Sequence, residues 1–152
     1  MLKIFNILSV TSVKMNQNCI FCKIITGEAN STKYYEDEET LVFKDIKPAA
    51  KHHFLSIPKK HITNINSLTK DDIPLVNKLV EEGKKVLLEQ KGETENMLLG
   101  FHCPPFNAIS HLHLHVISPR NEMSFLSQIM FRPKSWWFIT VDDVLHNLQN
   151  KL

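Results

Sequence analysis

The feature that most constrains this chain is an alternating segment from His111 to Val116, which reads His-Leu-His-Leu-His-Val. Successive side chains of a β-strand point to opposite faces of a sheet, so the alternation predicts three imidazoles on one face and three aliphatic side chains on the other. The aliphatic face can pack against a core, and the imidazole face can border a pocket. At a rise of about 3.3 Å per residue the outer histidines lie about 13 Å apart, which gives His113 the central position. A surface strand on which histidine is merely a tolerated polar residue is the plainer interpretation.

Length and composition predict one domain. A chain of 152 residues, of which 43% are hydrophobic, can bury the core of a single domain. A formal net charge of +2 is too small to indicate a nucleic acid or a membrane surface as the partner. Beyond residue 15, no stretch reaches the roughly 18 to 20 apolar residues needed to span a bilayer. We therefore expect one domain over residues 15–152, without membrane attachment.

The N-terminal segment, residues 1–14, is apolar and carries only two charges, Lys3 and Lys14. Polar residues interrupt its apolar run, and it lacks both a small-residue cleavage site and the arginine enrichment of a transit peptide. It is either a weak mitochondrial targeting segment or a dispensable leader, with translation beginning at Met15. The three cysteines, two of them in a Cys-x-x-Cys pair, are typical of reduced or metal-binding proteins. We expect a cytoplasmic protein, with the nucleus as a second location.

The other elements alternate unevenly along the chain and predict an α+β fold. Runs of β-branched and aromatic residues predict four strands before the histidine segment, at residues 32–36, 40–44, 53–58 and 96–102. Helical signals predict a short helix or turn, one long helix with a Thr69–Asp72 cap, and a short final helix, at residues 19–27, 69–90 and 142–152. The predicted architecture is a mainly antiparallel five-stranded sheet with one long helix and short terminal helices.

The histidine segment resembles the signature of the histidine triad superfamily, His-φ-His-φ-His-φ-φ, in which φ is an apolar residue. Three further segments follow the order and spacing of that family, at residues 19–24 (Cys-Ile-Phe-Cys-Lys-Ile), 43–48 (Phe-Lys-Asp-Ile-Lys-Pro) and 53–62 (His-Phe-Leu-Ser-Ile-Pro-Lys-Lys-His-Ile). The resemblance covers about residues 17 to 118. It implies the fold of this superfamily.

Within the superfamily, residues 100–106, Ser110-His111 and the tail at 125–140 resemble the branch that contains aprataxin and histidine triad nucleotide-binding proteins. Aprataxin acts on DNA adenylates with the help of a C-terminal zinc finger, whereas this chain has no cysteine after Cys103. A small purine nucleotide is therefore favoured as the substrate, and removal of adenylate from a DNA or RNA end is the alternative.

The resemblance implies hydrolysis of a nucleoside 5′-phosphoramidate or an aminoacyl adenylate, with release of AMP and an amine. It makes His113 the nucleophile, which forms a covalent nucleotidyl-imidazole that water then cleaves. A neutral imidazole, with a reference pKa of about 6.5, is a competent nucleophile near pH 7. The same resemblance assigns His115 and His53 to the phosphate, one or both as protonated donors that offset developing charge.

The substrate contacts also follow from the resemblance. Asp45 is assigned to the ribose hydroxyls, and Phe43, Ile46 and Phe21 to the wall around the purine. Ordinary core packing is the alternative for these apolar residues. His102 matches a histidine of the aprataxin-like branch and is a candidate contact to the phosphate or the leaving group, with a core position as its alternative.

One departure from the family pattern concerns the leaving group. Many relatives carry a serine three residues before the first histidine of the triad, where its hydroxyl assists the leaving group, and this chain has Ala108 there. Either the reaction is slower, or Asn107, Ser110 or His102 substitutes.

A second constellation implied by the resemblance is a structural zinc site formed by Cys19, Cys22, His61 and His111. Four protein ligands suit tetrahedral Zn²⁺ and leave no open position, so such a metal would brace the fold rather than react. His111 would then be structural. We expect no organic cofactor, and because relatives commonly pair, we expect a homodimer.

Three other functions compete with this interpretation. His111 and His113 could share a catalytic zinc, which would make the protein a metallohydrolase. The loss of the serine at Ala108 is compatible with a nucleotide-binding scaffold that has little activity. A basic and aromatic group in the tail, formed by Arg132, Lys134, Trp136 and Trp137, could stack a base and hold phosphate, with tail packing or a dimer interface as its alternative roles.

Overall fold

The computed structural model describes residues 15–151, so the leader predicted at residues 1–14 lies outside the described residues. Within them, six strands form one antiparallel sheet: β1 (Lys33–Glu36), β2 (Thr40–Lys44), β3 (His52–Pro58), β4 (Leu98–His102), β5 (Leu114–Ser118) and β6 (Phe138–Thr140). The helices are α1 (Ile20–Thr26), α2 (Ile73–Glu89), α3 (Phe125–Met130) and α4 (Val141–Gln149), with 3-10 turns η1 (Ile65–Ser67), η2 (Lys70–Asp72) and η3 (Arg120–Glu122). None of the helices described between residues 15 and 151 is long and apolar enough to cross a membrane.

The predicted α+β architecture is confirmed, and the sheet gains a sixth strand. The strand order is β1-β2-β3-β5-β4-β6, and every neighbouring pair is antiparallel. The unforeseen strand, β6, pairs with β4, so that Phe101 lies opposite Ile139. A strand of three residues shows too little alternation to be recognised by its pattern.

The regular strand begins later in the histidine segment than the alternation predicts, at Leu114 rather than at His111. The ladder between β3 and β5 runs from Ser56 opposite Leu114 to His52 opposite Ser118, so His111 to His113 precede the regular strand. Pro58 ends β3, and because proline has no N–H it cannot extend the ladder. The segment is fixed instead by other bonds, among them the one from the backbone N–H of Leu112 to the carbonyl of Ile62 at 2.7 Å.

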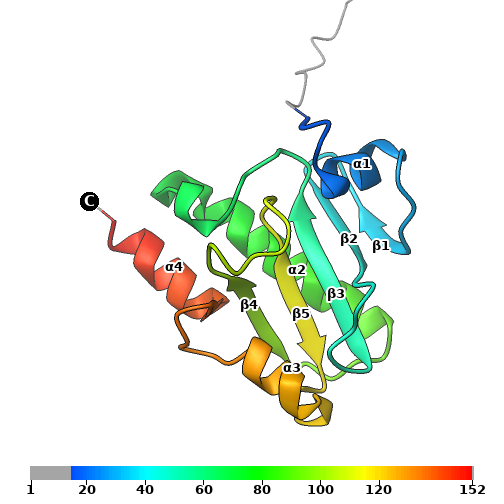
Figure 1. The fold of residues 1–152 in the computed structure, drawn as a ribbon, viewed down its shortest axis with the longest axis vertical. Coiled ribbons are helices and arrows are strands. Elements are labelled where there is room, and N and C mark those ends of the chain that lie inside the picture. Colours follow the sequence, from blue (N-terminus) through cyan, green and yellow to red (C-terminus); the bar gives the residue numbers. More distant parts are fainter. Residues whose placement is uncertain (1–14, 152) are drawn as a thin grey trace, which may run out of the picture.

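Different helices cover the two faces of the sheet (Figure 1). Helix α2 lies behind the strands in this view, and its Val76 and Leu79 share a core with Leu114 and Val116 of β5. A capping box between Thr69 and Asp72 begins this helical region, as predicted. On the opposite face, α1 covers one end and the segment around α3 covers the other. The imidazoles lie between these two covers.

Candidate active site and metal centre

Three imidazoles from three neighbouring strands form a bonded row on one face of the sheet. His53 comes from β3, His115 from β5 and His102 from β4, and these strands are adjacent in the sheet. Nε2 of His53 lies 2.9 Å from Nδ1 of His115, and Nε2 of His115 lies 3.1 Å from Nδ1 of His102. At the ends of the row, the Ala49 N–H donates to Nδ1 of His53 at 3.0 Å, and Nε2 of His102 lies 3.1 Å from the carbonyl of Met130.

His113 lies beside this row, and its Nε2 has no hydrogen-bond partner among residues 15–151. Its Nδ1 lies 2.6 Å from the carbonyl oxygen of His111. A carbonyl can only accept, so Nδ1 carries the proton and Nε2 carries the lone pair. The ring lies 4.9 Å from the His115 ring and 5.3 Å from the Phe21 ring, measured between centroids, and is 8% exposed. This geometry leaves Nε2 with a lone pair that is held in one orientation.

The surroundings of the imidazole row favour the neutral form of its three rings. Burial lowers the pKa of His53 to about 3, and burial also lowers the pKa of His115 and of His102. Neighbouring imidazoles act in the same direction on His53 and His115. This differs from the sequence-based expectation of protonated donors at His53 and His115. Near pH 7 both rings are neutral and offer one N–H each.

These pKa values predict a loss of stability in mild acid. Because the folded-state pKa of His53 lies below the unfolded value of about 6.5, the unfolded chain binds a proton that the folded chain excludes. The stabilisation is therefore complete above about pH 6.5 and is lost as the pH falls toward 3, by about 1.4 kcal/mol per pH unit for each such histidine. Urea unfolding at pH 7.5, 6.0 and 5.0, with metal chelated throughout, measures this. A His53→Gln variant should show a shallower slope, and a wild-type free energy of unfolding that is constant over this range would contradict the prediction.

Asp45 lies against the imidazole row. Its Oδ2 is 3.4 Å from Nε2 of His53, and its Oδ1 accepts the backbone N–H of Lys47 at 2.8 Å. Burial raises the pKa of this carboxyl group. A carboxylate here can accept hydroxyl protons, as the predicted ribose contact requires, from a position next to His53.

The residues predicted to surround the purine divide into two kinds. Phe21 and Phe43 are buried and meet edge to face, with ring centroids 5.4 Å apart. Both belong to the core beneath α1. Ile46 is 90% exposed, which leaves its side chain available to a ligand.

The loop before His111 contains two of the remaining predicted contacts, Asn107 and Ser110. Asn107 and His113 line a pocket of about 10 Å³, roughly the space of one water, together with His102 and His111. The amide of Asn107 already donates to the carbonyl of Ile109 at 3.2 Å. Ser110 is exposed next to His111, and Ala108 is exposed in the same loop.

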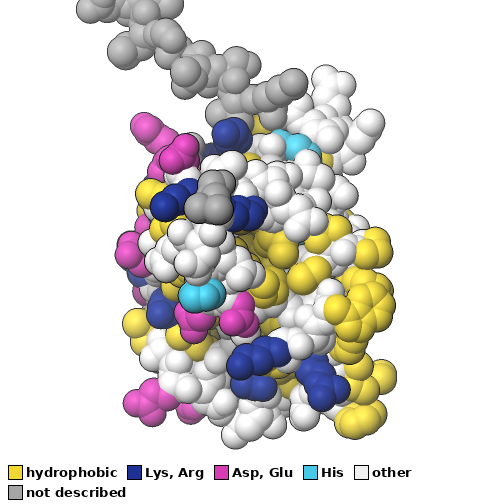
Figure 2. Space-filling model, turned by 90° about the vertical axis from the view of Figure 1, so that its left-hand side faces the viewer, with side chains coloured by type: hydrophobic (Ala, Val, Ile, Leu, Met, Phe, Trp, Pro, Cys, Tyr) yellow, Lys and Arg dark blue, Asp and Glu magenta, His cyan; other side chains and the backbone are white. Residues whose placement is uncertain are grey.

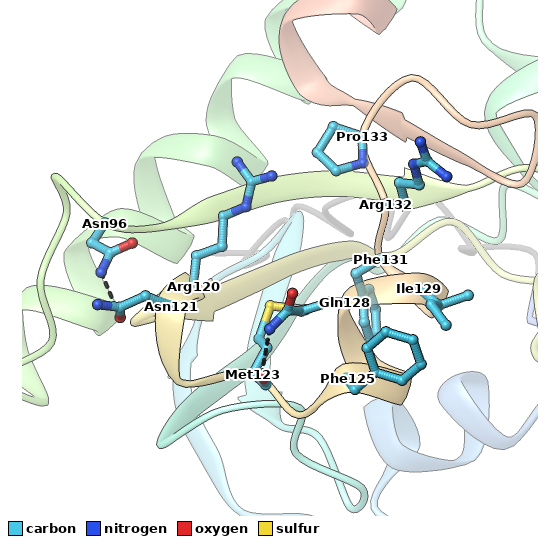
Figure 3. A pocket seen from close by; sticks show the side chains of 10 residues that line it. All are labelled: Asn96, Arg120, Asn121, Met123, Phe125, Gln128, Ile129, Phe131, Arg132 and Pro133. Atoms are coloured by element: carbon cyan, nitrogen blue, oxygen red, sulfur yellow. Dashed lines mark hydrogen bonds between the residues drawn. The ribbon is translucent and has the colours of Figure 1, made fainter.

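A larger cavity of about 600 Å³ lies beside α3 and does not contain the histidines (Figure 3). Its amides are already paired: Asn96 donates to Asn121 at 2.7 Å, and Gln128 donates to the carbonyl of Met123 at 2.9 Å. Its other lining residues are Arg120, Phe125, Ile129, Phe131, Arg132 and Pro133.

Phe131 separates this cavity from the imidazole row. Its ring centroid lies 5.4 Å from that of His53 and 5.0 Å from those of His102 and His115. Neither Phe131 nor the carbonyl of Met130 was identified from the sequence. A helix end that folds over the sheet leaves no signal in the alternation of the strands beneath it.

The tail aromatics have different surroundings. Trp137 packs against the core near Phe131, and its Nε1–H donates to the carbonyl of Ile129 at 3.0 Å, as expected for tail packing. Trp136 is 73% exposed and meets Phe106 edge to face.

The predicted metal ligands converge. Cys19, Cys22, His61 and His111 each offer one donor atom, and the four atoms lie within 4.8 Å of one another. Nδ1 of His111 is 3.2 Å from Nδ1 of His61, 3.5 Å from Sγ of Cys19 and 3.6 Å from Sγ of Cys22. Tetrahedral ligands at zinc bond lengths lie about 3.3 to 3.8 Å apart, so these spacings fit a zinc ion. This group could hold a metal ion.

The protonation of His111 also fits a metal ligand. Its Nε2 lies 2.8 Å from the carbonyl of Pro58 and must donate to it, which leaves the lone pair of Nδ1 facing the two thiols. A second group, Asp45, His53 and His115, is also close enough for a metal. It does not fit one, because the Ala49 N–H occupies Nδ1 of His53 and keeps the proton on Nε2, the atom that would have to bind. The geometry therefore gives no support to a catalytic metal among the imidazoles.

Comparisons with known proteins identify the family of this chain. A family model described as "Scavenger mRNA decapping enzyme C-term binding" matches residues 18–131. The adenosine 5′-monophosphoramidase HINT3 of Mus musculus is 46% identical over 138 residues, which cover 88% of this chain and 83% of the relative. Its counterpart from Xenopus tropicalis is 43% identical over 136 residues, covering 88% and 89%.

A solved structure agrees as well. A HIT family hydrolase from Clostridium thermocellum superposes with a TM-score of 0.64 at 35% identity, covering 68% of this chain and 91% of that one. The segment that carries His111, His113 and His115 is therefore the motif of a known family, and the chain belongs to the histidine triad family.

Proposed function

We propose that this chain is an adenosine 5′-monophosphoramidase, a hydrolase that releases AMP from nucleoside 5′-phosphoramidates. The observation that carries the proposal is His113, whose Nδ1–H is held by the carbonyl of His111 so that Nε2 is a neutral, oriented nucleophile. Relatives that are 43% and 46% identical over 88% of the chain bear the name of this activity.

The reaction proceeds in two displacements. In the first, Nε2 of His113 forms a bond to the α-phosphorus, the P–N bond breaks, and the leaving nitrogen takes the electron pair and a proton. In the second, a water oxygen bonds to the phosphorus and the P–Nε2 bond breaks, which returns the lone pair to His113, while the water gives up a proton and AMP is released. Splitting the hydrolysis in this way replaces one difficult step by two easier ones.

The neighbours of His113 support the charged stages of this reaction. His115 and His53 are neutral rings whose N–H groups are fixed along the row next to His113, and dipoles oriented in advance stabilise developing charge without reorganisation. Asp45 suits the ribose hydroxyls, and the exposed Ile46 suits the purine, with Phe21 and Phe43 as the further candidates that the resemblance gives. The resemblance offers Asn107, Ser110 and His102 as candidates to assist the leaving group.

A rapid-quench experiment tests this function. The full-length protein is mixed with a phosphoramidate labelled at the α-phosphorus, and label should appear on the protein within the first turnover. This label should be released by acid, because the bond between phosphorus and an imidazole nitrogen is acid-labile. AMP should then appear with the amine in equal amounts. A nucleotide-binding scaffold would retain the nucleotide without leaving label on the protein, and that result would end the proposal.

We also propose that Cys19, Cys22, His61 and His111 hold one structural Zn²⁺. The convergence of two thiols and two imidazole nitrogens at tetrahedral spacings supports this assignment. When bound, the ion cross-links the chain before β5 to α1 and to the loop after β3. With four protein ligands it has no open position for substrate, so its contribution is to stability.

We further propose that the protein is a homodimer with a purine nucleotide as its substrate. Exposed apolar side chains near α3 support an interface between copies: Phe125 is 76% exposed, Leu126 71% and Met130 55%. Figure 2 shows hydrophobic side chains gathered along one edge of the molecule. Light scattering after gel filtration should give twice the chain mass of 17.6 kDa, and a mass of one chain at micromolar concentration would contradict the dimer.

A further inference from the structure

The imidazole row has a fixed direction, because both of its ends are backbone groups of opposite kind. The Ala49 N–H can only donate, so Nδ1 of His53 is unprotonated and Nε2 of His53 carries the proton. That proton is donated to Nδ1 of His115, which therefore carries its own proton on Nε2. The His115 Nε2–H then reaches Nδ1 of His102, whose Nε2–H ends the row at the carbonyl of Met130.

We infer that His102 is a positioning residue for the proposed reaction: its Nδ1 holds the Nε2–H of His115 in place, while its own Nε2–H is anchored to the backbone of Met130. The inference rests on the proposed function, and it assigns to His102 a role through His115 rather than contact with the substrate. His102 lies on β4, outside the alternating segment that carries the family motif.

The need for this residue comes from burial. His115 is 5% exposed, and a buried N–H without an acceptor costs free energy and turns toward any partner it can find. His102 can accept only because the bond to Met130 keeps its own proton on Nε2. Without that acceptor, the ring of His115 is free to leave the orientation, 4.9 Å from His113, that it has in this structure.

Replacement of His102 should lower the rate of reaction rather than weaken substrate binding. A ring and its N–H dipole that are oriented beside His113 before the substrate arrives need no reorganisation in the transition state, so their displacement lowers kcat. The proposed ribose and purine contacts come from Asp45 and Ile46, which His102 does not hold. KM should therefore change little.

Substitution of His102 by asparagine or by glutamine tests its hydrogen bonds to His115 and to Met130 separately. The amide oxygen of asparagine can occupy the place of Nδ1 and accept from His115, and the amide nitrogen of glutamine can occupy the place of Nε2 and donate to Met130. We expect His102→Asn to lose about threefold in kcat and His102→Gln about ten- to a hundredfold, as for a buried donor left without an acceptor, with KM within about twofold in both. Thermal unfolding of both variants shows whether they are folded.

The ring proton of His115 gives a direct signature. In ¹⁵N-labelled full-length protein, the His115 Nε2–H should give a slowly exchanging imidazole signal, which His102→Asn retains and His102→Gln loses. The signal is assigned by its absence in His115→Gln. This measurement needs no substrate, so it tests the hydrogen-bond arrangement even if the wild-type protein releases no AMP. Failure to release AMP would contradict the proposed function, not the arrangement of the hydrogen bonds.

Two substrates distinguish positioning from direct proton transfer. The losses in kcat should be the same for an AMP amide of a weakly basic aromatic amine and for one of a strongly basic alkylamine. A loss that grows with the basicity of the leaving amine would make His102 a proton donor to the substrate and overturn the inference. So would a His102→Gln variant with wild-type kcat and an unchanged His115 signal.

Discussion

Replacing His113 by alanine should reduce phosphoramidate hydrolysis by at least about 10⁴-fold, because the residue that forms the covalent bond cannot be replaced by its neighbours. His115 and His53 both have their unprotonated nitrogens occupied by donors, at 2.9 and 3.0 Å, so neither presents a lone pair to phosphorus. Release of AMP under single-turnover conditions measures the loss. The variant should also take up no label from substrate labelled at the α-phosphorus.

His52 provides the matched control for this experiment. It is a histidine on β3 next to His53, but it stacks near Phe54 on the side of the sheet away from the imidazole row. His52→Asn should keep wild-type kcat and KM. If His113→Ala cleaves phosphoramidates at the wild-type rate, the nucleophile assigned here is wrong and so is the covalent mechanism.

Loss of the metal site should produce the largest change in stability. If free zinc is present at about 1,000 times its dissociation constant, binding contributes about 4 kcal/mol to folding, which corresponds to roughly 10 to 15 °C in Tm for a domain of this size. Cys22→Ser removes one of the two thiols that face Nδ1 of His111. We expect this variant to contain no zinc by elemental analysis and to unfold at a correspondingly lower temperature.

Cys103→Ser removes a thiol outside the group and should change neither metal content nor Tm appreciably. Chelation of the wild-type protein separates a structural metal from a catalytic one. Turnover at a temperature where the chelated protein is still folded should persist, with some loss because His111 both faces the metal and holds Nδ1 of His113. Complete loss of turnover in folded, metal-free protein would favour the metallohydrolase alternative.

The alternation of the histidine segment was sufficient to predict which side chains share a face. Leu114 and Val116 do lie in the core with α2, and His115 does lie on the other side. Alternation is a local property, and it holds wherever the segment is part of the sheet. It could not predict where the ladder begins, because that depends on Pro58, a residue more than fifty positions earlier that lacks the required N–H.

What covers the imidazole face could not be predicted from the strands themselves. The carbonyl of Met130 and the ring of Phe131 reach His102 from a tail whose only local signals are a short apolar helix and a three-residue strand. The protonation of His53 was equally hidden, because the Ala49 N–H that determines it belongs to a turn. Sequence patterns indicate the candidate reacting groups, whereas the protonated nitrogen of each ring depends on backbone N–H and carbonyl groups that carry no sequence signal.

Phe131 lies between the imidazole row and the cavity beside α3, and none of the three histidines of the row lines that cavity. One side of its ring contacts His53, His102 and His115, and the other lines the cavity beside α3. A molecule that entered the cavity and shifted this ring would also change its contacts with the imidazoles. A ligand of the cavity that shifted Phe131 would therefore also affect binding at the histidines, and by reciprocity a nucleotide bound at the histidines would alter the affinity of the cavity for that ligand.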